Sequence, residues 1–114
     1  MMRFKRADRV GGQVQKELSH LLQREIGDPR LDTVTIVHVS MTDDLRLARI
    51  YYTVGAGEEA KSGALAGFKS ASKYLRRKLS HRLELKHMPE LEFLYDESFE
   101  RAARVNQVLR EVIE

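Results

Sequence analysis

The chain has 114 residues, of which 42% are hydrophobic and 32% are charged, and its formal net charge is +3 at pH 7. This length suits one domain with its own core and is too short for two of ordinary size, so we expect a single domain over residues 1–114. The lack of cysteine excludes disulfides and thiolate metal sites. No apolar run follows the basic N-terminus and no stretch of about eighteen apolar residues occurs, so we expect a cytoplasmic protein without a membrane segment.

The first half of the sequence predicts a helix followed by two strands. Apolar residues recur every three or four positions over about residues 5–26, which is typical of an amphipathic helix, and Gly27-Asp28-Pro29 ends it. The β-branched run at 33–40 predicts a strand, residues 41–44 predict a turn, and residues 45–54 predict a second strand. We expect these two strands to form an antiparallel hairpin.

The second half predicts a long helix, a strand and a last helix. The helical period returns from about residue 58 over about twenty-five residues, as one kinked helix or as two. Charged and apolar residues alternate over 90–95 as in a half-buried strand. The final helix, over about 97–113, has an expected inner face of Ala102, Val105, Val108, Leu109 and Val112. This order predicts an α+β sandwich with helices on one face of a small sheet.

The most basic part of the chain runs from residue 69 to residue 86. It carries one acid, Glu84, and the following cations: Lys69, Lys73, Arg76, Arg77, Lys78, Arg82 and Lys86. In a helix, its apolar residues fall on one side and its first four cations on the other. Solvated helix faces usually mix both signs, and this one does not, so the pattern favours contact with RNA phosphates over a merely solvated face.

A second basic cluster lies at the N-terminus, where Arg3, Lys5, Arg6 and Arg9 are opposed only by Asp8. Cations in the first turn of a helix oppose its dipole, so helix stability does not explain them. We predict that this cluster contacts backbone phosphates, with frayed solubilising charge as the alternative.

Other candidate sites have simpler structural explanations. Tyr51, Tyr52 and Tyr74 could stack on bases, but packing is the better interpretation, and Tyr51 and Tyr52 must face opposite sides of the sheet. Asp43 and Asp44 fit a hairpin turn better than a metal or acid–base site. The four histidines lie apart without zinc-ligand spacing. We therefore expect no metal, no cofactor and no catalytic residue.

Four motifs, in the same order along the chain, resemble the bacterial ribosome-binding factor A family of small-subunit assembly factors. They are RADRV at residues 6–10, EIGDPRL at 25–31, VHVSMTDDL at 37–45 with Ala48, and MPELEFLYDES at 88–98. Each match alone is weak. Together they span nearly the whole chain, and the resemblance is therefore specific.

The resemblance implies a type II KH-like fold of order α-β-β-α-α-β, in which helices back a three-stranded sheet, with an added C-terminal helix. Ordinary KH domains bind nucleotides with a Gly-x-x-Gly loop, which this chain lacks. Family members instead have a helix interrupted at an Ala-x-Gly kink, and the matching positions are Ala71, Ser72 and Lys73. Because Lys73 stands where the family has glycine, either Ser72 supports a bend alone or the helix runs straighter.

The resemblance also implies a function. Family members bind the immature small (30S) ribosomal subunit near the ends of its 16S ribosomal RNA and promote late maturation and RNA processing, notably at low temperature. On this basis we expect a monomeric protein that catalyses no reaction and takes no small-molecule substrate. The residues alone indicate only an RNA-binding module. The alternatives are a generic KH-like module, a protein adaptor using a sheet edge or the last helix, and a metal-dependent nuclease using Asp43 and Asp44.

Overall fold

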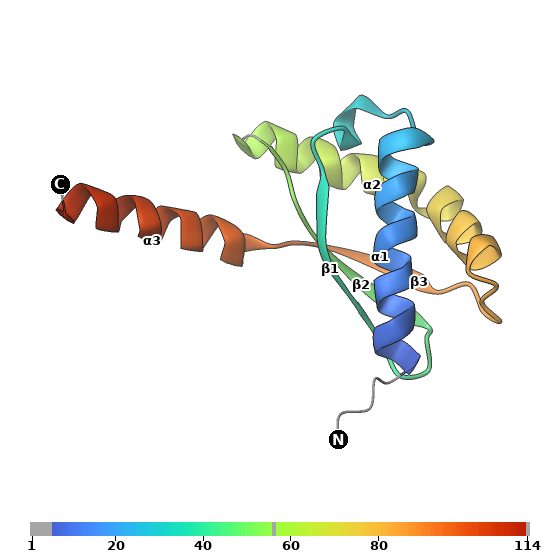
Figure 1. Cartoon of the computed structure of the whole chain (residues 1–114). Helices are drawn as coiled ribbons and strands as arrows, with labels where there is room; N and C mark the ends of the chain where they lie inside the picture. Colours follow the sequence, from blue (N-terminus) through green and yellow to red (C-terminus); the bar gives the residue numbers. More distant parts are fainter. Residues whose placement is uncertain (1–5, 56, 114) are drawn as a thin grey trace, which may run out of the picture.

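The computed structural model describes residues 6–55 and 57–113, which form three α-helices, one short 3-10 helix and a three-stranded sheet (Figure 1). The elements are, in chain order, α1 (Arg6–Arg24), η1 (Pro29–Leu31), β1 (Thr35–Met41), β2 (Leu47–Thr53), α2 (Gly57–Arg82), β3 (Glu90–Tyr95) and α3 (Glu97–Ile113). The predicted α+β class is confirmed. No described helix is long and apolar enough to cross a membrane.

The sheet has the order β1-β2-β3, with β2 in the centre. β1 and β2 pair antiparallel, as the predicted hairpin requires, and β2 pairs parallel with β3. A parallel pair needs a crossover connection, and α2 supplies it. The register of β1 shifts between Ile36 and His38, so this edge strand contains a bulge.

One face of the sheet is buried under α1 and α2. Ile36, Val39 and Ile50 point to this face and join one core with Leu18 of α1 and Phe68 of α2. Gly11 lets α1 approach the sheet closely, since a Cβ there would lie 2.9 Å from the carbonyl oxygen of Val39. The opposite sheet face is not covered by α1 or α2.

The segment that links α1 to β1 carries one of the family motifs, and its contacts are structural. Asp28 accepts hydrogen bonds from the backbone N–H of Arg30, at 2.9 Å, and from its guanidinium. This cap starts η1 and places Leu31 in the core, where it is 1% exposed. Leu31 packs so closely on α2 that a Cβ at Gly67 would lie 3.0 Å from it.

α2 is one continuous α-helix, so the helical pair of the expected order is a single element here. Its buried face consists of Ala64, Gly67, Phe68, Ala71, Leu75 and Leu79. In Figure 1 the green first half of α2 and its orange last turns run in different directions, and the change falls where α2 passes α1.

α3 differs from the prediction that its apolar side is an inner face. Figure 1 shows α3 projecting from the end of β3, away from the sheet and the other helices. Val105, Val108, Leu109 and Val112 are between 52% and 77% exposed. Periodicity correctly predicted the helix, but it could not predict whether another element covers the apolar side, and the prediction for these four residues is wrong.

The turn that follows α2 contains a left-handed residue, Glu84, whose φ is 52°. The backbone N–H of Leu85 donates to the carbonyl of Ser80 at 3.0 Å, as in a Schellman cap, where glycine is the usual left-handed residue. We therefore expect Glu84→Gly to raise the free energy of unfolding by about 0.5–1 kcal/mol. Urea unfolding checks this, with Glu84→Gln as the control that keeps the strained backbone. A destabilised glycine variant would contradict the cap.

Candidate nucleic-acid interface

Lys69, Lys73 and Arg77 form an exposed row along α2, which we call the cationic stripe. Their spacing of four residues keeps them on one side of the helix, opposite the side that packs on the sheet. None of the three forms an ion pair with another residue of the described ranges. Such a row of unneutralised charges is the surface that attracts a polyanion.

Arg76 was predicted to contact RNA, but the structure gives it intramolecular partners. Its guanidinium donates to the carbonyl oxygen of Pro89 at 2.8 Å and to the Glu90 carboxylate at 2.8 Å. The side chain is 23% exposed. Arg76 therefore ties α2 to the start of β3, and its charge is partly neutralised there.

Arg82 likewise links α2 to α1. It donates to Glu17 at 3.4 Å and to a carboxylate oxygen of Glu25 at 2.6 Å. The hydrogen bond from Arg82 is the main cause that holds the pKa of Glu25 below its ordinary value, and the charge of Lys78 adds to this effect. Lys78 itself is half-buried, and its ammonium lies 5.6 Å from the centre of the Tyr74 ring.

The Arg82–Glu25 contact should make stability depend on pH. Because the pKa of Glu25 is lowered in the folded state, the contact stabilises the protein above the ordinary pKa of 4.5 and is lost as pH falls through the lowered value. We expect Arg82→Gln to lower the melting temperature at neutral pH. Thermal unfolding across a pH series should show this difference shrinking below pH 4.5. If the two proteins differ in melting temperature by the same amount at acidic and neutral pH, the ion pair between Arg82 and Glu25 is not the cause.

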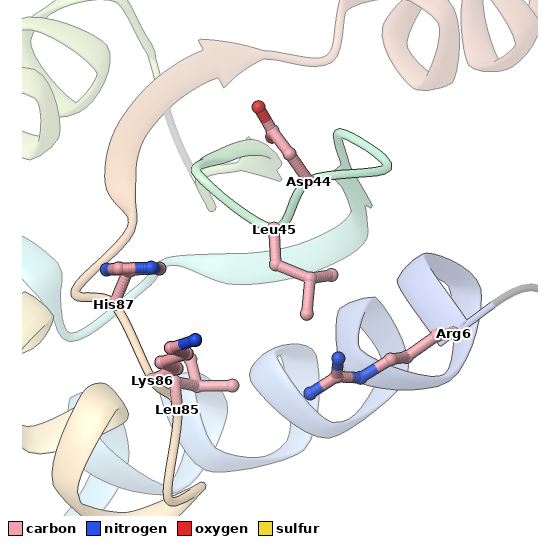
Figure 2. A pocket seen from close by; sticks show the side chains of 6 residues that line it. All are labelled: Arg6, Asp44, Leu45, Leu85, Lys86 and His87. Carbon is pink, nitrogen blue, oxygen red and sulfur yellow. The ribbon is translucent and has the colours of Figure 1, made fainter.

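The N-terminal cluster is described only in part, since Arg3 and Lys5 lie outside the described residues. Arg6 and Arg9 are exposed in the first turns of α1. Arg6 reaches a cavity of about 150 Å³ that is also lined by Lys86 and His87, which follow α2 (Figure 2). The structure thus brings one residue of the N-terminal cluster close to the end of the basic segment, by which we mean residues 69–86.

The residues that match the family's kink motif lie in the middle of α2. Ala71 is 8% exposed and faces the core, Ser72 is half-buried, and Lys73 is exposed in the cationic stripe. The helix is continuous through all three residues. Lysine at the third position adds a cation without interrupting the helix, in accordance with its high helix propensity.

Tyr51 and Tyr52 face opposite sides of the sheet, as predicted. Tyr52 is 2% exposed and meets Phe68 edge-on, with ring centres 4.9 Å apart, so it belongs to the core. Burial raises the pKa of its phenol. On the uncovered face the rings of Tyr51 and His38 stack with their centres 6.2 Å apart. This pair could not be predicted from the sequence, because the bulge in β1 decides which side His38 takes.

Asp43 and Asp44 lie in the turn between β1 and β2. Asp44 accepts hydrogen bonds from the Thr42 hydroxyl at 2.7 Å and from the backbone N–H of Arg46 at 3.1 Å, and these bonds lower its pKa. Among the described residues, no group of three or more histidine, aspartate or glutamate side chains could hold a metal ion. The structure therefore gives Asp44 a role in the turn.

The fold defines the class of protein: an α+β domain of KH-like type, with α1 and α2 on one side of a three-stranded sheet. The family model for ribosome-binding factor A matches residues 6–109. A ribosome-binding factor A of Desulfatibacillum aliphaticivorans is 47% identical over 94% of this chain and 87% of its own. The ribosome-binding factor A of Desulfosudis oleivorans is 42% identical over 98% of this chain and 87% of its own. The chain belongs to the ribosome-binding factor A family.

Solved structures of the family share the fold. The crystal structure of ribosome-binding factor A from Thermus thermophilus gives a TM-score of 0.69 at 28% identity and covers 78% of this chain and 94% of its own. A second structure is a model of Thermus thermophilus ribosome-binding factor A fitted into a cryo-EM map of its complex with the 30S subunit. Its TM-score is 0.66 at 27% identity, and the match covers 80% of this chain and 96% of its own. The chain thus has the fold of family members, one of which is placed on a ribosomal subunit.

Proposed function

We propose that this protein binds the small (30S) ribosomal subunit through its ribosomal RNA and promotes the late maturation of that subunit, including processing of its 16S RNA. The observation that carries the proposal is the cationic stripe, Lys69, Lys73 and Arg77, on a member of the ribosome-binding factor A family. Support also comes from the Thermus thermophilus protein that has been fitted into a complex with the 30S subunit.

Binding in this proposal acts by selection and needs no catalytic group. A ligand that prefers one RNA conformation shifts the population toward it by no more than its differential affinity for the two. The cationic stripe would contact backbone phosphates and position the domain, because such contacts carry affinity and little sequence information. The protein would act in the cytoplasm as a monomer, without a cofactor, and its effect would be largest at low temperature.

Co-sedimentation of the purified protein with isolated small subunits, large subunits and whole ribosomes, across a salt series, tests the proposal. We expect selective binding to the small subunit that weakens as salt rises, since displaced counterions make phosphate contacts salt-dependent. Equal binding to all three particles would reduce the function to generic RNA binding. Binding that does not respond to salt would indicate a protein adaptor.

A further inference from the structure

The cavity at the end of the basic segment is built from three parts of the chain that are distant in sequence. Arg6 comes from the start of α1, Leu45 from the turn between β1 and β2, and Leu85, Lys86 and His87 from the segment between α2 and β3. Figure 2 shows the Leu45 side chain and the Arg6 guanidinium directed toward the space between these segments. The fold therefore places apolar and cationic groups around one small opening.

The charge around the cavity is predominantly positive. Within the ranges that the structure describes, neither Arg6 nor Lys86 forms an ion pair. The one acid that lines the cavity is Asp44, whose carboxylate points away from Arg6 in Figure 2 and accepts hydrogen bonds within its own turn. An anionic group could therefore approach the two cations without facing this carboxylate.

The apolar walls of the cavity come from two leucines held by unusual backbone. Leu45 has a φ of 62°, and Glu84, with a φ of 52°, directly precedes Leu85. Leu45 and Glu84 are the two non-glycine residues with positive φ in the described part of the chain. Such conformations cost of order 1 kcal/mol or more, and the hairpin turn and the cap of α2 hold them in place. Leu45 and Leu85 pack partly against the core and also line the cavity.

The size and chemistry together select a class of ligand. A volume of about 150 Å³ is below the range of about 300–1,000 Å³ typical of sites for drug-sized molecules, so it suits one small ring system. A bare anion would leave the two leucines without a role, and an apolar ligand would leave the two cations without one. A single nucleotide uses both, through its base and its phosphate.

We propose that this cavity holds the base of one unpaired nucleotide between Leu45 and Leu85, while Arg6 and Lys86 contact its phosphates. Unstacked bases in loops and bulges are the usual targets of proteins that read RNA, because paired bases in an A-form helix are hard to reach. The inference rests on the proposed function, since it names the RNA feature that the protein would select on the small subunit. It adds a shape-specific contact to the general contacts of the cationic stripe.

Three RNA hairpins of the same sequence test the proposal: one fully paired, one with a single bulged adenosine, and one with an abasic bulge. We expect the wild-type protein to bind the bulged hairpin about 10-fold more tightly than the other two, as burial of one base against two leucines would give. Leu45→Asn, which tolerates positive φ, should remove this preference, whereas the double variant R6Q/K86Q should weaken binding to the bulged and abasic hairpins alike. The control K16Q/R24Q changes two exposed cations of α1 that do not line the cavity and should keep the preference.

Equal wild-type affinity for the three hairpins would overturn the proposal, and so would a preference that survives in Leu45→Asn or an unchanged affinity of R6Q/K86Q for the bulged hairpin. Circular dichroism confirms that each variant is folded. Co-sedimentation with small subunits separates this inference from the proposed function. Persistent co-sedimentation without a bulge preference removes the inference alone, whereas a bulge preference without co-sedimentation removes the ribosomal function and keeps the nucleotide site.

Discussion

Neutralising the cationic stripe with K69Q/K73Q/R77Q is expected to weaken binding to isolated small subunits about 100-fold. Each lost phosphate contact should cost about 1 kcal/mol, and three such losses give this factor. The slope of log affinity against log salt should also become shallower by about 2 to 3, because fewer counterions are released on binding. Co-sedimentation or filter binding at several salt concentrations measures both effects.

The matched control removes three exposed cations elsewhere, Lys16 and Arg24 on α1 and Arg110 on α3. Its net charge equals that of the stripe variant, so a larger loss in the stripe variant assigns the effect to position. Arg76 is left out of the stripe variant because its bonds to Pro89 and Glu90 join α2 to β3. Equal weakening by both triple variants would show that the protein attracts RNA through its total charge.

Phe68→Ala is expected to lower the free energy of unfolding by about 3–5 kcal/mol. Phe68 is 0% exposed, and its ring stacks on Phe93 with centres 4.1 Å apart while Tyr52 meets it edge-on. It therefore joins α2 to the two neighbouring strands β2 and β3. Removing the ring leaves a cavity that this contact region cannot fill. Since domains are stable by only about 5–15 kcal/mol, the loss is a large fraction of the total.

Urea unfolding of the wild type and of Phe68→Ala measures this loss directly. Leu65→Ala is the control on the same helix, because Leu65 is 39% exposed and its truncation should change stability by less than about 1 kcal/mol. A loss for Phe68→Ala as small as that of the control would contradict the central position of this ring. The stripe variant should unfold like the wild type, because its three side chains lie on the exposed side of α2.

Local patterns in the sequence predicted the elements well. Periodicity predicted helix 5–26 where α1 spans Arg6–Arg24, and alternation predicted 90–95 where β3 lies. The turn chemistry at Asp43 and Asp44 correctly predicted the hairpin. These features depend on residues that are close together in the chain, so a single sequence contains most of the information that determines them.

Contacts between distant residues could not be predicted in this way. Arg82 was predicted to contact RNA, and this role stays a prediction, but its bonds to Glu17 and Glu25, on or just after α1, could not be foreseen. The apolar side of α3 was expected to be covered, and no pattern within one helix can show whether a partner element reaches it. The cavity around Leu45 combines three separate segments, and only the folded chain shows that they meet.

The predicted interface itself divides into two groups. Lys69, Lys73 and Arg77 are exposed, as contact with RNA requires, and their role stays a prediction. Arg76 and Arg82 have carboxylate partners, which is the outcome that a count of positive charges overlooks. Helix periodicity separates part of them, because Arg82 follows Leu75 by seven residues and Leu79 by three and so falls on the buried side of α2.

The bulge in β1 has a consequence for how copies of this protein behave in a crowded solution. β1 is an edge strand, and exposed edges of sheets promote pairing with strands of other molecules. Here the bulge interrupts the ladder between Ile36 and His38, and the Gln15 amide of α1 donates to the carbonyl oxygens of Ile36 and Val37 at 3.4 and 3.2 Å. Two carbonyl oxygens of β1 next to the bulge thus already have a partner within the molecule, which leaves fewer acceptors for a strand of another copy.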